Sequence, residues 1–113
     1  MAKISSSIAS HIPCPVSERL KQARMQRKFS QRGLGIAAGI DEASASARMN
    51  QYERGKHVPD YKMLCSLAGV LRVPIPYFYA NDDDAKLLLN LALLSNEQQE
   101  LIRELVKRLN FNL

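Results

Sequence analysis

Five residues between positions 46 and 51 carry side chains suited to contacting the edges of DNA bases. Gln51 and Asn50 have planar amides that donate and accept hydrogen bonds together, which matches the N6/N7 edge of adenine. Arg48 can bind guanine through two hydrogen bonds or neutralise a phosphate. Ser46 can donate or accept, and Ala47 can contact a thymine methyl. The alternative is that these residues face solvent on a helix and contact nothing.

The segments around these residues are typical of two short helices joined by a turn. Residues 30–39 form a helical segment that ends in a glycine, a common residue just after a helix. A second helix is expected from residue 43 or 44 to 54, where Gly55 stops it and basic Lys56 follows. Two short helices, a turn and a basic loop predict a helix-turn-helix that docks on DNA.

The spacing of the remaining apolar residues indicates which side chains form the core. Met49 and Tyr52 lie three positions apart on the second helix and are expected to face inward. Cys65 lies within an apolar helical pattern and is expected to be a small core residue. Gly33 and Gly35 weaken the first helix, so we expect them to permit close approach of a neighbouring helix.

The whole pattern predicts an all-α fold of five helices with one or two further helices at the C-terminal end. We expect a flexible arm over residues 1–16, a helix-turn-helix domain over 17–81 and a helical extension over 82–113. Five other helices are expected. The first starts at N-cap Ser17, the next runs over 60–71 from N-cap Asp60, and a short one starts at Pro76. The last two run over 85–94 and from a capping box at Ser95 as far as Leu109.

With these segments in order, the sequence resembles the Cro/CI-type, lambda-repressor-like (XRE) helix-turn-helix family over about residues 17–79. Each matching piece is weak alone, but their order and spacing together are specific. The matching positions are Leu20 with Arg24, Phe29-Ser30-Gln31, Ala37-Ala38-Gly39-Ile40, Tyr52-Glu53-Arg54-Gly55-Lys56, Pro59, Leu64, Leu67-Ala68, Leu71, Val73 and Tyr77-Phe78.

The resemblance implies a role for individual residues. Ser46, Ala47 and Gln51 match positions that reach base edges. Gln31 and Lys56 match positions that contact the DNA backbone, and Arg32 is a further candidate for phosphate. Arg24 and Glu53 match an ion pair that joins the first helix to the end of the reading helix.

One departure from the family is the connection between Ile40 and Glu53, which is several residues longer than usual. The extra residues, around 41–45, either lengthen the turn or add a turn to the reading helix. Asp41 and Glu42 would repel phosphate if a longer loop pointed toward DNA.

The charge distribution agrees with a nucleic-acid partner. The chain carries a formal net charge of +5. Residues 1–81 hold 12 Lys/Arg against 5 Asp/Glu, whereas residues 82–113 hold 4 against 6. Basic charge concentrated on the helix-turn-helix part is what phosphate neutralisation requires, although a basic solvated surface has the same composition.

Other classes of function find little support in the sequence. Two cysteines without a Cys-x-x-Cys motif indicate neither a disulfide framework nor a metal site, and we expect no cofactor. Phosphate loops and hydrolase motifs are absent, so we expect no enzyme. The N-terminal residues are not those of a signal peptide and no apolar run could span a membrane, so we expect a cytoplasmic protein.

The C-terminal helices carry an apolar stripe that one small domain does not need. We expect this stripe to form a homodimer that binds a palindromic operator, most simply as a repressor without a small-molecule effector. It could instead fold back on its own domain, or grip another protein as an antitoxin does. The stripe consists of Leu101, Ile102, Leu105, Val106 and Leu109.

Overall fold

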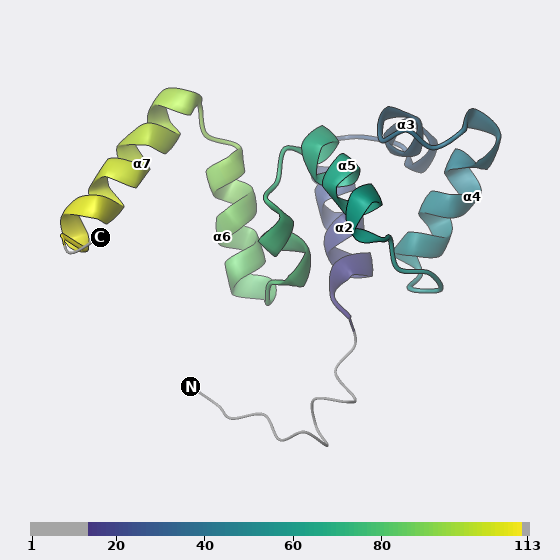
Figure 1. The fold of residues 1–113 in the computed structure, drawn as a ribbon, viewed down its shortest axis with the longest axis horizontal. Coiled ribbons are helices and arrows are strands. Elements are labelled where there is room, and N and C mark those ends of the chain that lie inside the picture. Colours follow the sequence, from purple (N-terminus) through teal and green to yellow (C-terminus); the bar gives the residue numbers. More distant parts are fainter. Residues whose placement is uncertain (1–13, 112–113) are drawn as a thin grey trace, which may run out of the picture.

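A computed structural model describes residues 14–111, so most of the expected N-terminal arm lies outside the described residues. Within that range the chain contains no strand, which confirms the all-α prediction (Figure 1). The helices are α2 Val16–Gln26, α3 Gln31–Ala37, α4 Glu42–Glu53, α5 Tyr61–Leu71, the 3-10 helix η1 Ile75–Tyr79, α6 Asp82–Ala92 and α7 Asn96–Leu109.

Side-chain caps fix most of the helix starts. The Ser30 hydroxyl accepts a hydrogen bond from the Gly33 N–H, and the Asp60 carboxylate accepts one from the Met63 N–H. The Ser95 capping box is complete, as the sequence predicted. The prediction of Ser17 as a cap was wrong. The N-cap position lies two residues earlier, at Pro15, and α2 begins at Val16, because Pro15 has a backbone conformation that leads into a helix.

The core lies among α2, α3, α4, α5 and η1. Met49 and Tyr52 are buried in it as predicted. Cys65 is exposed, so its assignment to the core was wrong. α5 buries Leu64, Leu67, Ala68 and Leu71, a spacing that leaves position 65 about 100° away from Leu64 toward solvent.

Gly35 determines how closely α3 and α4 pack. A Cβ atom at this position would lie 3.0 Å from both the Ala45 Cβ and the Met49 Cγ. The predicted close approach is therefore confirmed for Gly35. Gly33 differs, because a Cβ there would meet the Ser30 hydroxyl that caps its own helix, at 2.9 Å.

The last two helices leave the body of the domain. α6 starts at Asp82, earlier than expected, because Asn81 caps it and acidic residues suit the positive end of a helix. Ala85 is the one fully buried residue of α6, and α7 buries none. α7 therefore does not fold back on the domain, and it points away from α2–α5 in Figure 1.

Candidate nucleic-acid interface

Helix α4 has a buried face and a polar exposed face. Ala45, Met49 and Tyr52 are buried against the rest of the domain. The residues between them point outward, so the structure brings the predicted base-reading side chains onto one open surface. All five are exposed: Ser46, Ala47, Arg48, Asn50 and Gln51.

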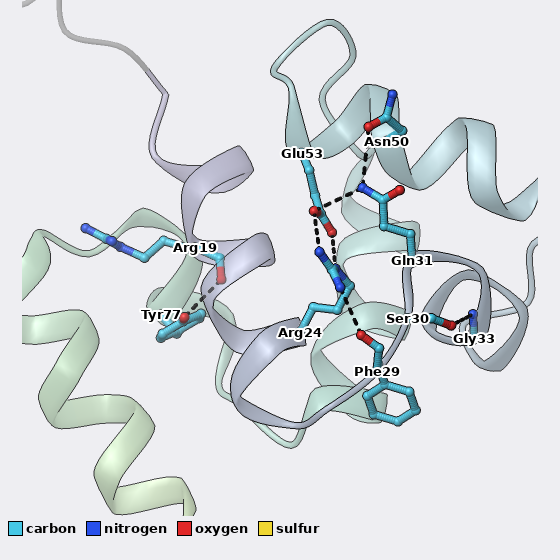
Figure 2. A network of polar contacts seen from close by, with 9 residues as sticks. All are labelled: Arg19, Arg24, Phe29, Ser30, Gln31, Gly33, Asn50, Glu53 and Tyr77. Carbon is cyan, nitrogen blue, oxygen red and sulfur yellow. Dashed lines mark hydrogen bonds and ion pairs between the residues drawn. The ribbon is translucent and has the colours of Figure 1, made fainter.

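An ion pair anchors the C-terminal end of α4 to α2 (Figure 2). Arg24 Nε lies 2.5 Å from Glu53 Oε2, and Arg24 Nη2 lies 3.0 Å from Glu53 Oε1. The Arg24 Nη1 also donates to the Phe29 carbonyl oxygen, at 2.9 Å. The Glu53 side chain is only 3% exposed. Two parallel hydrogen bonds between planar groups fix both distance and orientation, so this pair sets where α4 ends.

The side-chain amide of Gln31 turns toward α4 (Figure 2). Its Nε2 donates to Glu53 Oε1 at 3.2 Å and approaches Asn50 Oδ1 at 3.4 Å. Both amide hydrogens of Gln31 therefore have acceptors on α4. The side chain predicted to bind phosphate is engaged inside the domain, and it also orients Asn50.

The long connection after Ile40 adds to the helix and does not lengthen the turn. α4 starts at Glu42 directly after Asp41, so the extra residues form its first turn. Arg32, a predicted phosphate contact, pairs there with Glu42. The Arg32 and Glu42 side chains are 53% and 73% exposed, so the pair is weak and can exchange partners.

Basic side chains surround the exposed face of α4. Lys56 is exposed just after Gly55, whose φ of +73° turns the chain away from the helix. A hollow between α4 and α5 is lined by Arg48, Gln51, His57 and Lys62 among others. His57 and Lys62 were not among the residues predicted from the sequence. The signal that could have identified them is their position on either side of Pro59, close to the end of α4.

The predicted dimer residues form an open apolar stripe on α7. They are between 37% and 71% exposed, and α7 carries no buried residue.

No helix within residues 14–111 is both long and apolar enough to cross a membrane.

Comparison with known proteins places this geometry in a family. No family model matches the chain. The Bacillus subtilis (strain 168) protein YqaE, an uncharacterized HTH-type transcriptional regulator, is 33% identical over 81 residues, which cover 66% of each protein. The crystal structure of the transcriptional regulator BswR superposes with a TM-score of 0.70 at 42% identity, and the match covers 81% of this chain and 92% of that one. Both similar proteins are regulators and not enzymes, and the chain belongs to the HTH-type transcriptional regulators.

Proposed function

We propose that this protein is a sequence-specific regulator that binds a palindromic operator in double-stranded DNA as a homodimer. The observation that carries the proposal is the polar exposed face of α4, which is held in place by the Arg24–Glu53 pair. A rigid helix with short polar side chains on its open face fits the major groove.

Base contacts are assigned to the residues of that face. Gln51 is the central reader because its amide can bind adenine through two hydrogen bonds. Arg48 is suited to guanine, and Asn50 presents an amide that Gln31 holds in position. Ser46 and Ala47 complete the surface.

Phosphate contacts are assigned to the edges of the interface. Lys56 is exposed and unhindered just beyond α4. Arg32 contacts a phosphate when its exposed pair with Glu42 opens. Gln31 does so only by releasing one amide hydrogen from α4, which makes it the weakest of the three.

The α7 stripe is the proposed dimer surface. The start of α7 carries Glu97 and its end carries Lys107 and Arg108, so an antiparallel pair of helices places opposite charges together. Burying five half-exposed apolar side chains on each copy yields about 10 kcal/mol in total, at about 1 kcal/mol for each. This gain is close to the association cost of about 4–15 kcal/mol, so the leucines of α6 must contribute as well.

Repression is the simplest outcome of such binding. A compact dimer over a promoter blocks access without contacting any other protein. Residues 82–111 form two helices with one fully buried residue, Ala85, and the hollow between these helices is open to solvent.

The test is selection of bound sequences from a random duplex library, at two salt concentrations, with the purified chain. We expect a palindromic motif and an affinity that falls steeply with salt. Gln51→Ala should lower the affinity for the motif roughly tenfold, and the lost base preference should be confined to one base position in each half-site. Gln26→Ala, an exposed glutamine on α2, is the matched control and should change nothing. Salt-sensitive binding without a motif would refute sequence-specific reading.

The oligomeric state is tested by sedimentation velocity. Leu105→Glu should convert a wild-type dimer into a folded monomer, because two like charges would face each other in an apolar interface. Asn90→Glu, on the exposed side of α6, should leave the dimer intact. A dimer that survives Leu105→Glu would place the interface elsewhere.

The same stripe also supports a second candidate, an antitoxin-like protein whose C-terminal helices bind a different protein. The supporting observation is a hollow between α6 and α7, lined by Leu88, Leu91 and Ile102 and flanked by Arg72 and Arg103. A wild-type chain that is monomeric at high concentration would favour this candidate over the homodimer.

A further inference from the structure

Arg19 is a charged residue in the interior, and two of its three guanidinium hydrogen bonds reach the joint between η1 and α6. It is only 3% exposed. Its Nε donates to the Ala80 carbonyl oxygen at 3.0 Å, and its Nη2 donates to Asp82 Oδ1 at 2.7 Å. Its Nη1 donates to Gln22 Oε1 at 2.9 Å, and the Tyr77 hydroxyl donates to its backbone oxygen at 2.9 Å.

This joint is where the C-terminal helices leave the domain. Ala80 directly follows η1 and Asp82 is the first residue of α6, so the guanidinium of Arg19 holds both sides of the bend. Apolar packing also holds α6, since Ala85 is fully buried and Leu88, Leu89 and Ala92 are partly buried against the core. At the bend itself, the side-chain hydrogen bonds of Arg19 fix the direction in which α6 starts.

The helix that carries Arg19 also carries the anchor of the reading helix. Arg24 lies five residues later on α2, which places it about 140° around the helix from Arg19. Figure 2 shows the two arginine side chains extending to different sides of α2, with Arg24 toward Glu53 at the end of α4, while the backbone oxygen of Arg19 accepts the hydrogen bond from Tyr77. α2 thus joins the start of α6 to the end of α4.

Small errors at this joint become large at the far end of α6. Eleven residues span about 16 Å, so a tilt of about 10° displaces the end of α6 by about 3 Å. Successive base pairs are about 3.4 Å apart. A tilt of this size therefore moves one reading helix by about one base pair relative to the other.

We propose that Arg19 is a positioning residue that sets the spacing between the two half-sites of the operator. It does so by fixing the direction of α6, and through it the dimer surface on α7, relative to the reading helix. This inference rests on the proposed function, because it requires two reading helices joined through the C-terminal helices.

The experiment measures affinity for duplexes that carry two half-sites at a series of spacings, and for a duplex with one half-site. The variants are Asp82→Ala, which removes the carboxylate partner of Arg19 from an exposed position, and Arg19→Lys, which cannot reach all three acceptors from one nitrogen. Asp83→Ala is the matched control, since it removes the same charge from the same helical turn. Circular dichroism verifies that each variant is folded.

Wild type should prefer one spacing by at least tenfold, and Asp83→Ala should keep that preference. Asp82→Ala and Arg19→Lys should bind one half-site as wild type does but discriminate among neighbouring spacings by less than threefold. A spacing profile as sharp as that of wild type in Asp82→Ala would overturn the inference and leave Arg19 a purely structural residue. Wild type with no spacing preference would instead refute the proposed dimeric reader, and the inference with it.

Discussion

Removing one partner of the Arg24–Glu53 pair should destabilise the domain far more than breaking the exposed Arg32–Glu42 pair. The Glu53 side chain is 3% exposed and the Arg24 side chain 14% exposed, and two hydrogen bonds join them. Glu53→Gln replaces one carboxylate oxygen with an amide NH2 that faces the donors of Arg24. The buried positive charge then loses its counter-charge.

The magnitude follows from this burial. Removing one partner of a buried ion pair costs about 3–5 kcal/mol. Arg24 keeps its hydrogen bond to the Phe29 carbonyl oxygen, so the lower end, about 3 kcal/mol, is expected. For a domain of this size such a loss lowers the melting temperature by roughly 10–20 °C. The exposed pair of Arg32 with Glu42 should be worth less than about 1 kcal/mol.

Urea unfolding followed by circular dichroism measures these losses, with Glu42→Gln as the control for Glu53→Gln. The double variant with Met at positions 24 and 53 should recover most of the lost stability, because an apolar pair leaves no unpaired charge behind. Equal losses for Glu53→Gln and Glu42→Gln would refute the reasoning. A double variant Arg24→Met/Glu53→Met that is less stable than Arg24→Met alone and Glu53→Met alone would also refute it.

Three further predictions follow from single contacts. Gly35→Ala should destabilise the domain by about 1–2 kcal/mol, because it overpacks α3 against α4. Gly69→Ala should stabilise the domain by up to about 1 kcal/mol, because a Cβ there meets nothing within 4 Å. Urea unfolding of both variants tests the difference. Burial raises the pKa of Tyr77, while the charge of Arg19 opposes the rise. The stability of the domain should therefore hold below about pH 10 and fall above it. Tyr77→Phe should flatten that fall in unfolding measured from about pH 7 to 11. Arg32→Ala should weaken DNA binding several-fold in a fluorescence titration, and adding Glu42→Ala should restore part of the loss if unpaired acid repels phosphate.

Much of the fold could be predicted because its determinants are local. The caps at Ser30, Asp60 and Ser95 act within three residues of themselves, and a short pattern in the sequence identifies them. The same holds for the exposed face of α4, because the buried positions Met49 and Tyr52 fix the orientation of the helix. Periodicity alone then places the residues between them on the outside.

What could not be predicted depends on contacts between distant segments. Arg19 reads as an ordinary surface residue, and its partners Ala80 and Asp82 lie 61 and 63 positions away. The hydrogen bonds of Gln31 to α4 could not be predicted either, because their acceptors come within reach only after α3 and α4 pack. Cys65 was assigned to the core because an apolar pattern does not show which edge of the stripe is covered.

The lengthened connection shows why the same extra residues could not be assigned to loop or helix in advance. Glu42 and Ala43 suit the first turn of a helix as well as a polar loop, so local preference does not decide. The structure adds them to α4, and Glu42 then lies where Arg32 can pair with it. This pairing offsets the charge of the acidic first turn, and the proposed base-reading residues Arg48 and Gln51 lie in the second half of α4. The added residues therefore extend α4 at its start, while the Arg24–Glu53 pair anchors its other end to α2.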